Sequence, residues 1–490
     1  MRFTHIFLAF ILLLLCSCNK EEPAPQVSLK RFKVDNAVRC TYHEQNIQIS
    51  FSLEDDDVEV SVSKNVEWAT NLTLLPKNII SADITENDGA ERVATITLSA
   101  PGYADAKVSV KQNGAPTSLA SHTLMFYFFG TSLNSYFSTN IADAKLAIES
   151  GALGNDCRVV FFRQRNKSEG YLGELCYDKD SGKCFESLIE DNIIIEGERI
   201  SSQYISKIIN KMADAAPAQR YGMVMAGHGR AWLPKDSSRA CTSSLWKELF
   251  VPAPGAEVTR HFGENNVQVD ISDIANGISD SAIDIDYILF DACFMSNIEA
   301  LYELRNSANY IIASPCEIMG RGFPYERTLP HLFRDNGAYT DYSGAAESYY
   351  LYYRDEYYSN SRCGSIAVYN CSEIESLKNA TIEVVKSSLE EYDKSDLQTY
   401  EGQPQHYFYD FGQWVNSVAT DSAALEAFNT QLNKTVITKY TLNTFYTAFG
   451  SYGSMPINVD VYSGVTTSAP SEILESLWIE TEWYKEVWQL

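Results

Sequence analysis

The sequence predicts an α/β domain that is preceded by a small all-β sandwich. Between Phe32 and Gly114, stretches such as NIQISFSL and RVATITLSA alternate apolar and polar residues with a period of two, which is typical of half-buried strands. From Thr123 onward, short apolar runs alternate with helical segments. Runs this apolar indicate strands that are covered on both faces, as in a parallel or mixed α/β sheet.

The composition argues against nucleic acid as a partner. The chain has 490 residues, enough for two or three domains, and a formal net charge of −25. Such a surface repels phosphates, and no arginine-rich stripe offsets it. We therefore expect no nucleic-acid role.

The first residues, 1–17, form a targeting segment. Basic Arg2 is followed by an apolar run, Ile6–Leu15, that is too short to span a membrane comfortably. The run ends in LCSC, which resembles a lipobox with Cys18 as the lipidated residue. Asn19–Glu22 resembles the acidic signal that sends Bacteroidetes lipoproteins to the cell surface. We expect an outer-membrane lipoprotein at the cell surface. A periplasm-facing lipoprotein and an ordinary cleaved secretory signal are the alternatives.

The predicted β-sandwich occupies residues 32–114, after a tether over residues 18–31 and before a linker over residues 115–122. Its turns are expected at Glu54–Asp57 and Asn87–Gly89. Its second half, which closes with VSVKQNG, resembles a BACON domain, a module that often precedes a catalytic domain. We include glycans among its expected contacts. The acidic run Glu54–Asp57 is expected to be a solvated turn rather than a calcium site.

The α/β block divides into a domain over residues 123–400 and a completing subdomain over residues 401–490. Its expected strands are the runs TLMFYFFG, CRVVFFRQ, YGMVMAGHG, YILFDAC, NYIIASP and GSIAVYN. Its expected helices are Ile141–Glu149, Ser201–Ala215, Asn297–Arg305, Ala345–Glu356 and Ser372–Glu391.

The remaining cysteines do not have the spacing of a metal site. No C-x-x-C pair occurs and the histidines do not cluster with cysteines, so we expect no structural zinc. An exported chain can form disulfides, and Cys176–Cys184 or Cys363–Cys371 are candidates. Buried single thiols are the commoner alternative.

Two strand ends carry residue types that suit nucleophilic catalysis. The run MVMAGHGRAW holds His228, and the run ILFDAC ends at Cys293. Reactive residues lie at the carboxyl ends of strands in open α/β sheets, and an imidazole can activate a thiol. Gly229 lets a backbone N–H approach an oxyanion, with the N–H of Cys293 as a second donor. Taken alone, a cysteine after an apolar strand is more often a buried thiol, and a histidine between glycines is more often an ordinary loop residue. Together, at the ends of successive strands, the two motifs favour an active site.

The sequences MAGHG and FDACFMSNIEALYEL, followed by YIIASPCEIMGRGFPY, resemble the clostripain-like cysteine peptidases, relatives of caspases, gingipains, legumains and separases. The resemblance covers about Leu124 to Asn370 and implies a caspase-like α/β/α sandwich. It implies that His228 is the catalytic histidine, Cys293 the nucleophile and Gly229 part of the oxyanion hole. It places Asp291 in the pocket for the residue before the scissile bond (P1), where it would attract Arg or Lys. The structural alternative is that Asp291 caps the following helix.

The resemblance implies further properties of the enzyme. The chemistry needs no cofactor, a calcium requirement is compatible with the family, and members often cleave themselves between the His and Cys motifs. Candidate cut sites in the intervening Ala231–Gln268 segment are Lys235, Arg239, Lys247 and Arg260.

One residue departs from the family pattern. Relatives that prefer Arg or Lys often carry an acidic residue in a Gly-x-Gly turn, where this chain has Arg321. A side chain that points to solvent leaves the basic preference in place but weaker. The alternative is that Arg321 pairs with Asp291 and the pocket takes neutral or acidic side chains.

The sequence therefore favours a lipid-anchored cysteine endopeptidase that acts on proteins or peptides. The alternative is a weakly active or inactive surface lipoprotein that captures peptides, mucin or glycans. The presence of both His228 and Cys293 speaks against the inactive form. A glycan-processing enzyme fits poorly, because no carboxylate pair stands at a recognisable spacing.

Overall fold

The structure, a computed structural model, describes residues 29–489 except 56, 116–117, 155, 196–199, 235–251, 254, 261–268, 390, 404–405, 450–455, 470 and 472–474. The predicted signal segment, Cys18 and most of the tether lie outside the described residues, as do Lys235, Arg239 and Lys247. No helix among the described residues is long and apolar enough to cross a membrane.

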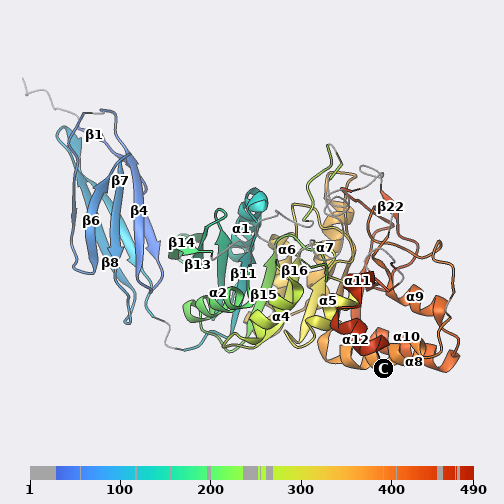
Figure 1. Ribbon diagram of the computed structural model, residues 1–490. Helices are drawn as coiled ribbons and strands as arrows, with labels where there is room; N and C mark the ends of the chain where they lie inside the picture. The colour runs from blue at the N-terminus through green and yellow to red at the C-terminus, as the bar shows by residue number, and fades with distance from the viewer. Residues whose placement is uncertain are drawn as a thin grey trace, which may run out of the picture.

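The N-terminal part is a two-sheet β-sandwich (Figure 1). One sheet has the order β3-β10-β8-β5, the other β2-β4-β7-β6, and β1 pairs with β9. Alternate residues of β4, among them Ile47, Ile49 and Phe51, are buried between the sheets, as the period-two pattern predicts. The strands are β1 Lys30–Arg31, β2 Lys33–Val34, β3 Ala37–Cys40, β4 Gln45–Ser52, β5 Ser61–Lys64, β6 Ala69–Leu75, β7 Ile79–Ile84, β8 Arg92–Ser99, β9 Tyr103–Ala104 and β10 Ala106–Gln112. The relation to BACON domains stays a prediction.

The rest of the described chain is built on a nine-stranded mixed sheet of order β14-β13-β12-β11-β15-β16-β17-β18-β20. The central strands β12, β11, β15, β16 and β17 run parallel, and the outer strands pair antiparallel. The strands are β11 His122–Phe128, β12 Cys157–Gln164, β13 Glu169–Asp178, β14 Lys183–Ile194, β15 Tyr221–Ala226, β16 Ile285–Asp291, β17 Tyr310–Ala313, β18 Ile366–Asn370 and β20 Val436–Tyr440. The mixed sheet confirms the predicted fold class.

Helices cover both faces of this sheet, which makes the α/β/α sandwich. One core lies between the sheet and the face formed by α2 Ser202–Ala215, α4 Ile271–Ser279, α5 Ile298–Glu303 and α8 Ile374–Val385. The other lies under α1 Asn134–Glu149, α6 Tyr325–Leu332 and α7 Tyr342–Asp355. The C-terminal block adds α9 Phe411–Val418, α10 Ser422–Thr435, α11 Glu475–Trp478, α12 Glu482–Trp488 and the edge strand β20.

The β-sandwich packs against β14 at the outer edge of the large sheet (Figure 1). The backbone N–H of Thr41 donates to Ser187 Oγ at 3.1 Å, and His43 Nε2 lies 2.9 Å from the carbonyl oxygen of Ala215. Arg39 forms an ion pair with Asp178. The sandwich thus covers an edge that would otherwise offer unpaired backbone groups.

Candidate active site

The structure brings His228 and Cys293 to the same edge of the sheet. They follow β15 and β16, which are neighbours in parallel register, with Ala226 opposite Asp291. The backbones that follow the two strands touch: a Cβ on Gly229 would lie 2.2 Å from the carbonyl oxygen and 2.7 Å from the nitrogen of Cys293. Glycine at 229 is therefore required for this approach.

The side chain of His228 contacts the turn that follows β11, the strand beside β15. The hydroxyl oxygen of Ser132, in the turn after β11, lies 2.8 Å from His228 Nε2. Gly130, at φ +113°, brings the same turn against the ring, since a Cβ there would lie 3.2 Å from His228 Cδ2. The sequence reasoning missed Ser132, because no spacing marks a serine in an adjacent turn as a partner of this histidine.

The thiol of Cys293 is fully buried and neutral in this state. Its sulfur accepts from the N–H of Ile318 at 3.0 Å and lies 3.6 Å from the carbonyl oxygen of Ile318. Burial raises the pKa of the Cys293 thiol well above its ordinary value, and the charge of Glu317 raises it further. To react as a thiolate, Cys293 would need a change of surroundings.

A peptide carbonyl from the same chain lies between the two motifs that follow β15 and β16. The carbonyl oxygen of Arg260 accepts from the N–H of Gly229 at 3.0 Å and from the N–H of Cys293 at 3.3 Å. These are the two donors that the sequence predicts for the oxyanion hole. Two convergent backbone donors on one carbonyl are the arrangement that stabilises a tetrahedral oxyanion.

The side chain of Arg260 fills a closed pocket whose charged wall is Asp291. Its guanidinium lies 2.8 Å from the Asp291 carboxylate, and neither side chain is exposed to solvent. It also donates to Asn140 Oδ1 at 2.7 Å and to the carbonyl oxygen of Gly320 at 3.2 Å, and it lies over the Phe137 ring. This pocket is shaped for a basic side chain.

Asp291 belongs to this pocket and does not cap the following helix. Its carboxylate accepts from Tyr325 Oη at 2.7 Å and from the N–H of Phe323 at 3.3 Å. Burial raises the pKa of Asp291, and the charge of Arg260 opposes that rise. The cap of α5 is Asn297 instead.

The segment Val258–Arg260 pairs with Ile318–Gly320 as an additional antiparallel strand. The N–H of Arg260 donates to the carbonyl oxygen of Ile318 at 2.7 Å, and the N–H of Gly320 donates to the carbonyl oxygen of Val258 at 2.6 Å. Thr259 and Met319 form an antiparallel bridge between these bonds. Extended peptides bind exposed backbone edges in this way.

Arg321 lies beside the pocket but is engaged elsewhere. Its guanidinium donates to Asp143 of α1 at 2.5 Å. The alternative in which Arg321 pairs with Asp291 does not occur here, because Arg260 holds Asp291. The sequence did not identify Asp143, which lies far from the turn along the chain.

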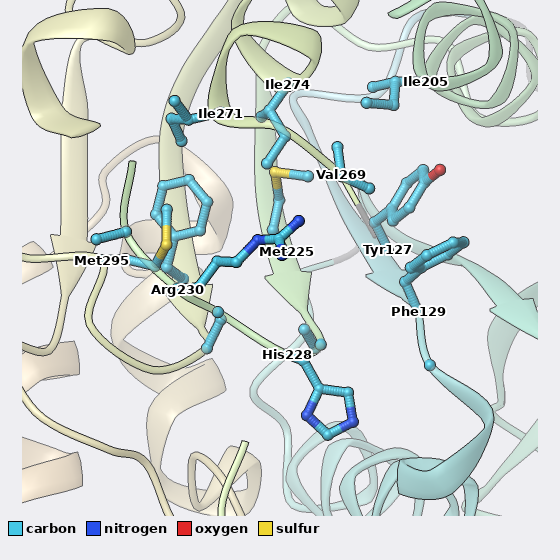
Figure 2. A pocket seen from close by; sticks show the side chains of 17 residues that line it. Tyr127, Phe129, Ile205, Met225, His228, Arg230, Val269, Ile271, Ile274 and Met295 are labelled. Atoms are coloured by element: carbon cyan, nitrogen blue, oxygen red, sulfur yellow. The ribbon is translucent and has the colours of Figure 1, made fainter. Parts of the chain in front are cut away.

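An apolar pocket of about 90 Å³ lies beside His228, on the face of the sheet that α2 and α4 cover (Figure 2). Its walls come from the α2 and α4 face of the sheet and include Tyr127, Met225, Val269, Ile274 and Met295. The pocket and the Asp291 pocket thus flank the His228–Cys293 edge on opposite faces of the sheet.

The structure describes most of the cysteines that were considered as zinc ligands or disulfide partners. Among the described residues, no group of three or more His, Cys, Asp or Glu side chains could hold a metal ion. The described cysteines are buried free thiols, so the buried-thiol alternative describes them and the pairs Cys176–Cys184 and Cys363–Cys371 are not bridged.

Comparison with known proteins shows the family of the chain. The model of the clostripain family matches residues 131–468, well over half of the chain. Clostripain of Hathewaya histolytica is 24% identical over 140 residues, which cover 28% of this chain and only 25% of that relative.

Solved structures match the same part of the chain. A secreted C11 cysteine protease of Bacteroides thetaiotaomicron, iotapain, is 30% identical with a TM-score of 0.65, over 76% of this chain and 99% of that one. An inactive zymogen C11 protease of Parabacteroides distasonis is 28% identical with a TM-score of 0.62, over 76% of this chain and 100% of that one. On the match of the family model, this chain belongs to the clostripain family.

Proposed function

We propose that this chain is an exported, lipid-anchored cysteine endopeptidase that uses Cys293 and His228 and cleaves after Arg or Lys. One observation carries the proposal. Arg260 lies in the site as a substrate would, with its carbonyl between the N–H groups of Gly229 and Cys293 and its side chain on Asp291.

The proposed reaction uses these groups after the thiol of Cys293 has left its contacts with Ile318. The thiol of Cys293 gives its proton to His228 as its sulfur forms a bond to the carbonyl carbon of the P1 residue, and the oxyanion accepts from the N–H groups of Gly229 and Cys293. The C–N bond then breaks, and His228 gives its proton to the leaving amine. Water hydrolyses the thioester, which releases the carboxylate product and returns the proton to the dyad.

The same contact supports self-processing. In this state the site is filled by its own chain and Cys293 is covered, which is the condition of a precursor. We propose that the first bond cut is Arg260–His261, since Arg260 is the one candidate cut site within the described residues that sits in the pocket. Cleavage there frees the segment that occupies the site.

The preference for a basic P1 residue rests on Asp291. A charge-assisted hydrogen bond contributes about 1.5–3 kcal/mol, or about ten- to a hundredfold in preference. The charge of Arg321 still acts on Asp291, but the pairing of Arg321 with Asp143 weakens its opposition to a P1 cation. The pocket therefore favours Arg or Lys over neutral and acidic side chains.

The proposed location rests on the sequence before the described residues. Lipidation at Cys18 and the acidic residues after it support an outer-membrane lipoprotein that faces the cell exterior, with the β-sandwich between anchor and peptidase as the part that contacts glycans. Labelled palmitate should appear in the wild-type protein and not in Cys18→Ala. Protein that resists protease added to intact cells would place it in the periplasm.

The test of the catalytic proposal is the fate of the chain itself. Wild type should split into two fragments, the second beginning at His261, and should hydrolyse peptides after Arg or Lys. Cys293→Ala should stay whole and inactive, and His228→Ala should lose about 10²–10⁴ in rate. Turnover retained by Cys293→Ala would reject the cysteine-peptidase mechanism, and cleavage mainly after Asp, Glu or small residues in a peptide library would reject the basic pocket.

A further inference from the structure

The residue before Arg260 also has a specific partner. The hydroxyl of Thr259 donates to Glu317 Oε2 at 2.5 Å. Thr259 thus occupies the position next to P1, called P2, and Glu317 is the polar group that receives its side chain.

Glu317 is a buried carboxylate with few donors around it. It is fully inaccessible to solvent, and Oε1 accepts from the hydroxyl of Thr447 at 2.7 Å and from the N–H of Ala448 at 3.0 Å. The same N–H of Ala448 lies 3.2 Å from Oε2, so Thr259 supplies the shorter of the two hydrogen bonds to that oxygen. The titratable groups that respond to its charge are the thiols of Cys293, Cys316 and Cys363 and the phenols of Tyr407 and Tyr446. None of them supplies a positive charge, so the P2 hydroxyl is an important donor to Oε2.

A buried carboxylate oxygen discriminates sharply between side chains of equal size. When ionised, it can only accept, so a threonine hydroxyl donates to it, whereas the methyl group of valine in the same place leaves Oε2 with only the longer hydrogen bond from Ala448. Leaving a buried charged acceptor unsatisfied costs more than the net gain of an ordinary hydrogen bond. The contact is made by an atom attached directly to Cβ, so a long basic side chain would have to fold back to reach it.

We propose that Glu317 selects substrates that carry a hydroxyl side chain, threonine or serine, immediately before the basic P1 residue. The inference rests on the proposed function, because it takes the bound Val258–Arg260 segment as the image of a substrate. The site therefore recognises two adjacent side chains. Glu317 accepts from the hydroxyl of P2, and Asp291 pairs with the cation of P1.

Peptides that differ in one group test this in the full, self-processed protein. The probes are acetyl-Val-Thr-Arg-aminomethylcoumarin and its Val-Val-Arg, Val-Ser-Arg and Val-Lys-Arg counterparts. The Thr peptide should exceed the Val peptide in kcat/KM by about ten- to a hundredfold, and the Ser peptide should lie near the Thr peptide. In Glu317→Gln, which keeps the size but removes the charge, the Thr/Val ratio should fall below about threefold.

A second measurement does not need the Glu317 variant to fold. Thr259→Val should slow self-cleavage by a similar factor, while the matched Thr259→Ser should remain close to wild type.

The outcomes separate the two proposals. If none of the peptides is cleaved, the proposed function fails. If Thr and Val peptides are cleaved equally, or the Lys peptide is preferred, the peptidase stands and the P2 inference is overturned. A Thr/Val ratio that survives unchanged in Glu317→Gln would show that the charge of Glu317 does not select the hydroxyl, and would overturn the inference.

Discussion

At the scale of single residues, Gly229 leaves no room for a side chain. A side chain there would overlap the backbone of Cys293, and both residues donate to the same carbonyl oxygen. Gly229→Ala should therefore lower kcat by about 10²–10³, the usual cost of losing one oxyanion donor. Peptide hydrolysis and self-cleavage are the measurements.

The matched control is Gly89→Ala in the β-sandwich, where a Cβ would meet nothing closer than 3.6 Å. This variant should behave as wild type. A Gly229→Ala enzyme with an unchanged rate would remove Gly229 from the oxyanion hole.

Glu317 should also make the free energy of unfolding depend on pH. Burial raises the pKa of Glu317 from 4.5 to about 7 in the folded chain. The unfolded chain therefore releases this proton at lower pH than the folded chain, and the folded state loses stability as the pH rises from about 4.5 to about 7. The loss is about 3 kcal/mol.

Urea unfolding in a Cys293→Ala background, which keeps the chain whole, measures this. Between pH 5 and pH 7.5 the free energy of unfolding should fall more steeply with Glu317 present than in the additional Glu317→Gln variant. Parallel curves for the two proteins would contradict the raised pKa.

At the scale of elements, the bound segment acts as one more strand. Arg260 donates its N–H to Ile318, whereas the N–H of Val258 has no hydrogen bond within the described part of the chain. N-methylation of the P1 nitrogen in acetyl-Val-Thr-Arg-aminomethylcoumarin should lower kcat/KM by about tenfold or more, because it removes a donor and adds bulk. The same methyl group on the P3 nitrogen should have a much smaller effect. Equal losses at both positions would contradict binding as a strand.

The elements that the sequence predicts well are those covered on both faces. CRVVFFRQ coincides with β12, because the central residues Val159–Phe162 of that strand are all buried and apolar. The hairpin β13–β14 escaped prediction, since β14 alternates irregularly between buried and exposed residues at the sheet edge. The helix α1 begins at Asn134, seven residues before the predicted start at Ile141, because the mostly polar residues of its first turns show little apolar periodicity.

The residues of the candidate site also fall into two groups, those that the local sequence indicates and those that it does not. His228, Gly229, Asp291 and Cys293 stand in two short motifs at strand ends, so local sequence indicates them. Ser132, Asn140 and Glu317 act through contacts between segments far apart in the chain. No spacing within a motif reports such contacts, and the sequence offered Arg260 only as one cut site among four.

At the scale of the whole molecule, the proposed cut divides the sheet between two central strands. The first fragment keeps the β-sandwich and β11 to β15, and the second keeps β16, β17, β18 and β20. β15 and β16 remain joined by a parallel ladder from Tyr221 opposite Ile285 to Ala226 opposite Asp291. Both cores that flank the sheet also draw residues from each fragment.

The two fragments should therefore stay assembled after cleavage, because separating them would expose both cores and the edges of two buried strands. Processed protein should give two bands on a denaturing gel but one peak in size-exclusion chromatography, at the volume of uncut Cys293→Ala. Urea should separate the fragments only as it unfolds them. Separate elution in native buffer would show that the Arg260–His261 bond is needed to hold the sheet together, and would contradict the view that cleavage opens the site while leaving its two strands in place.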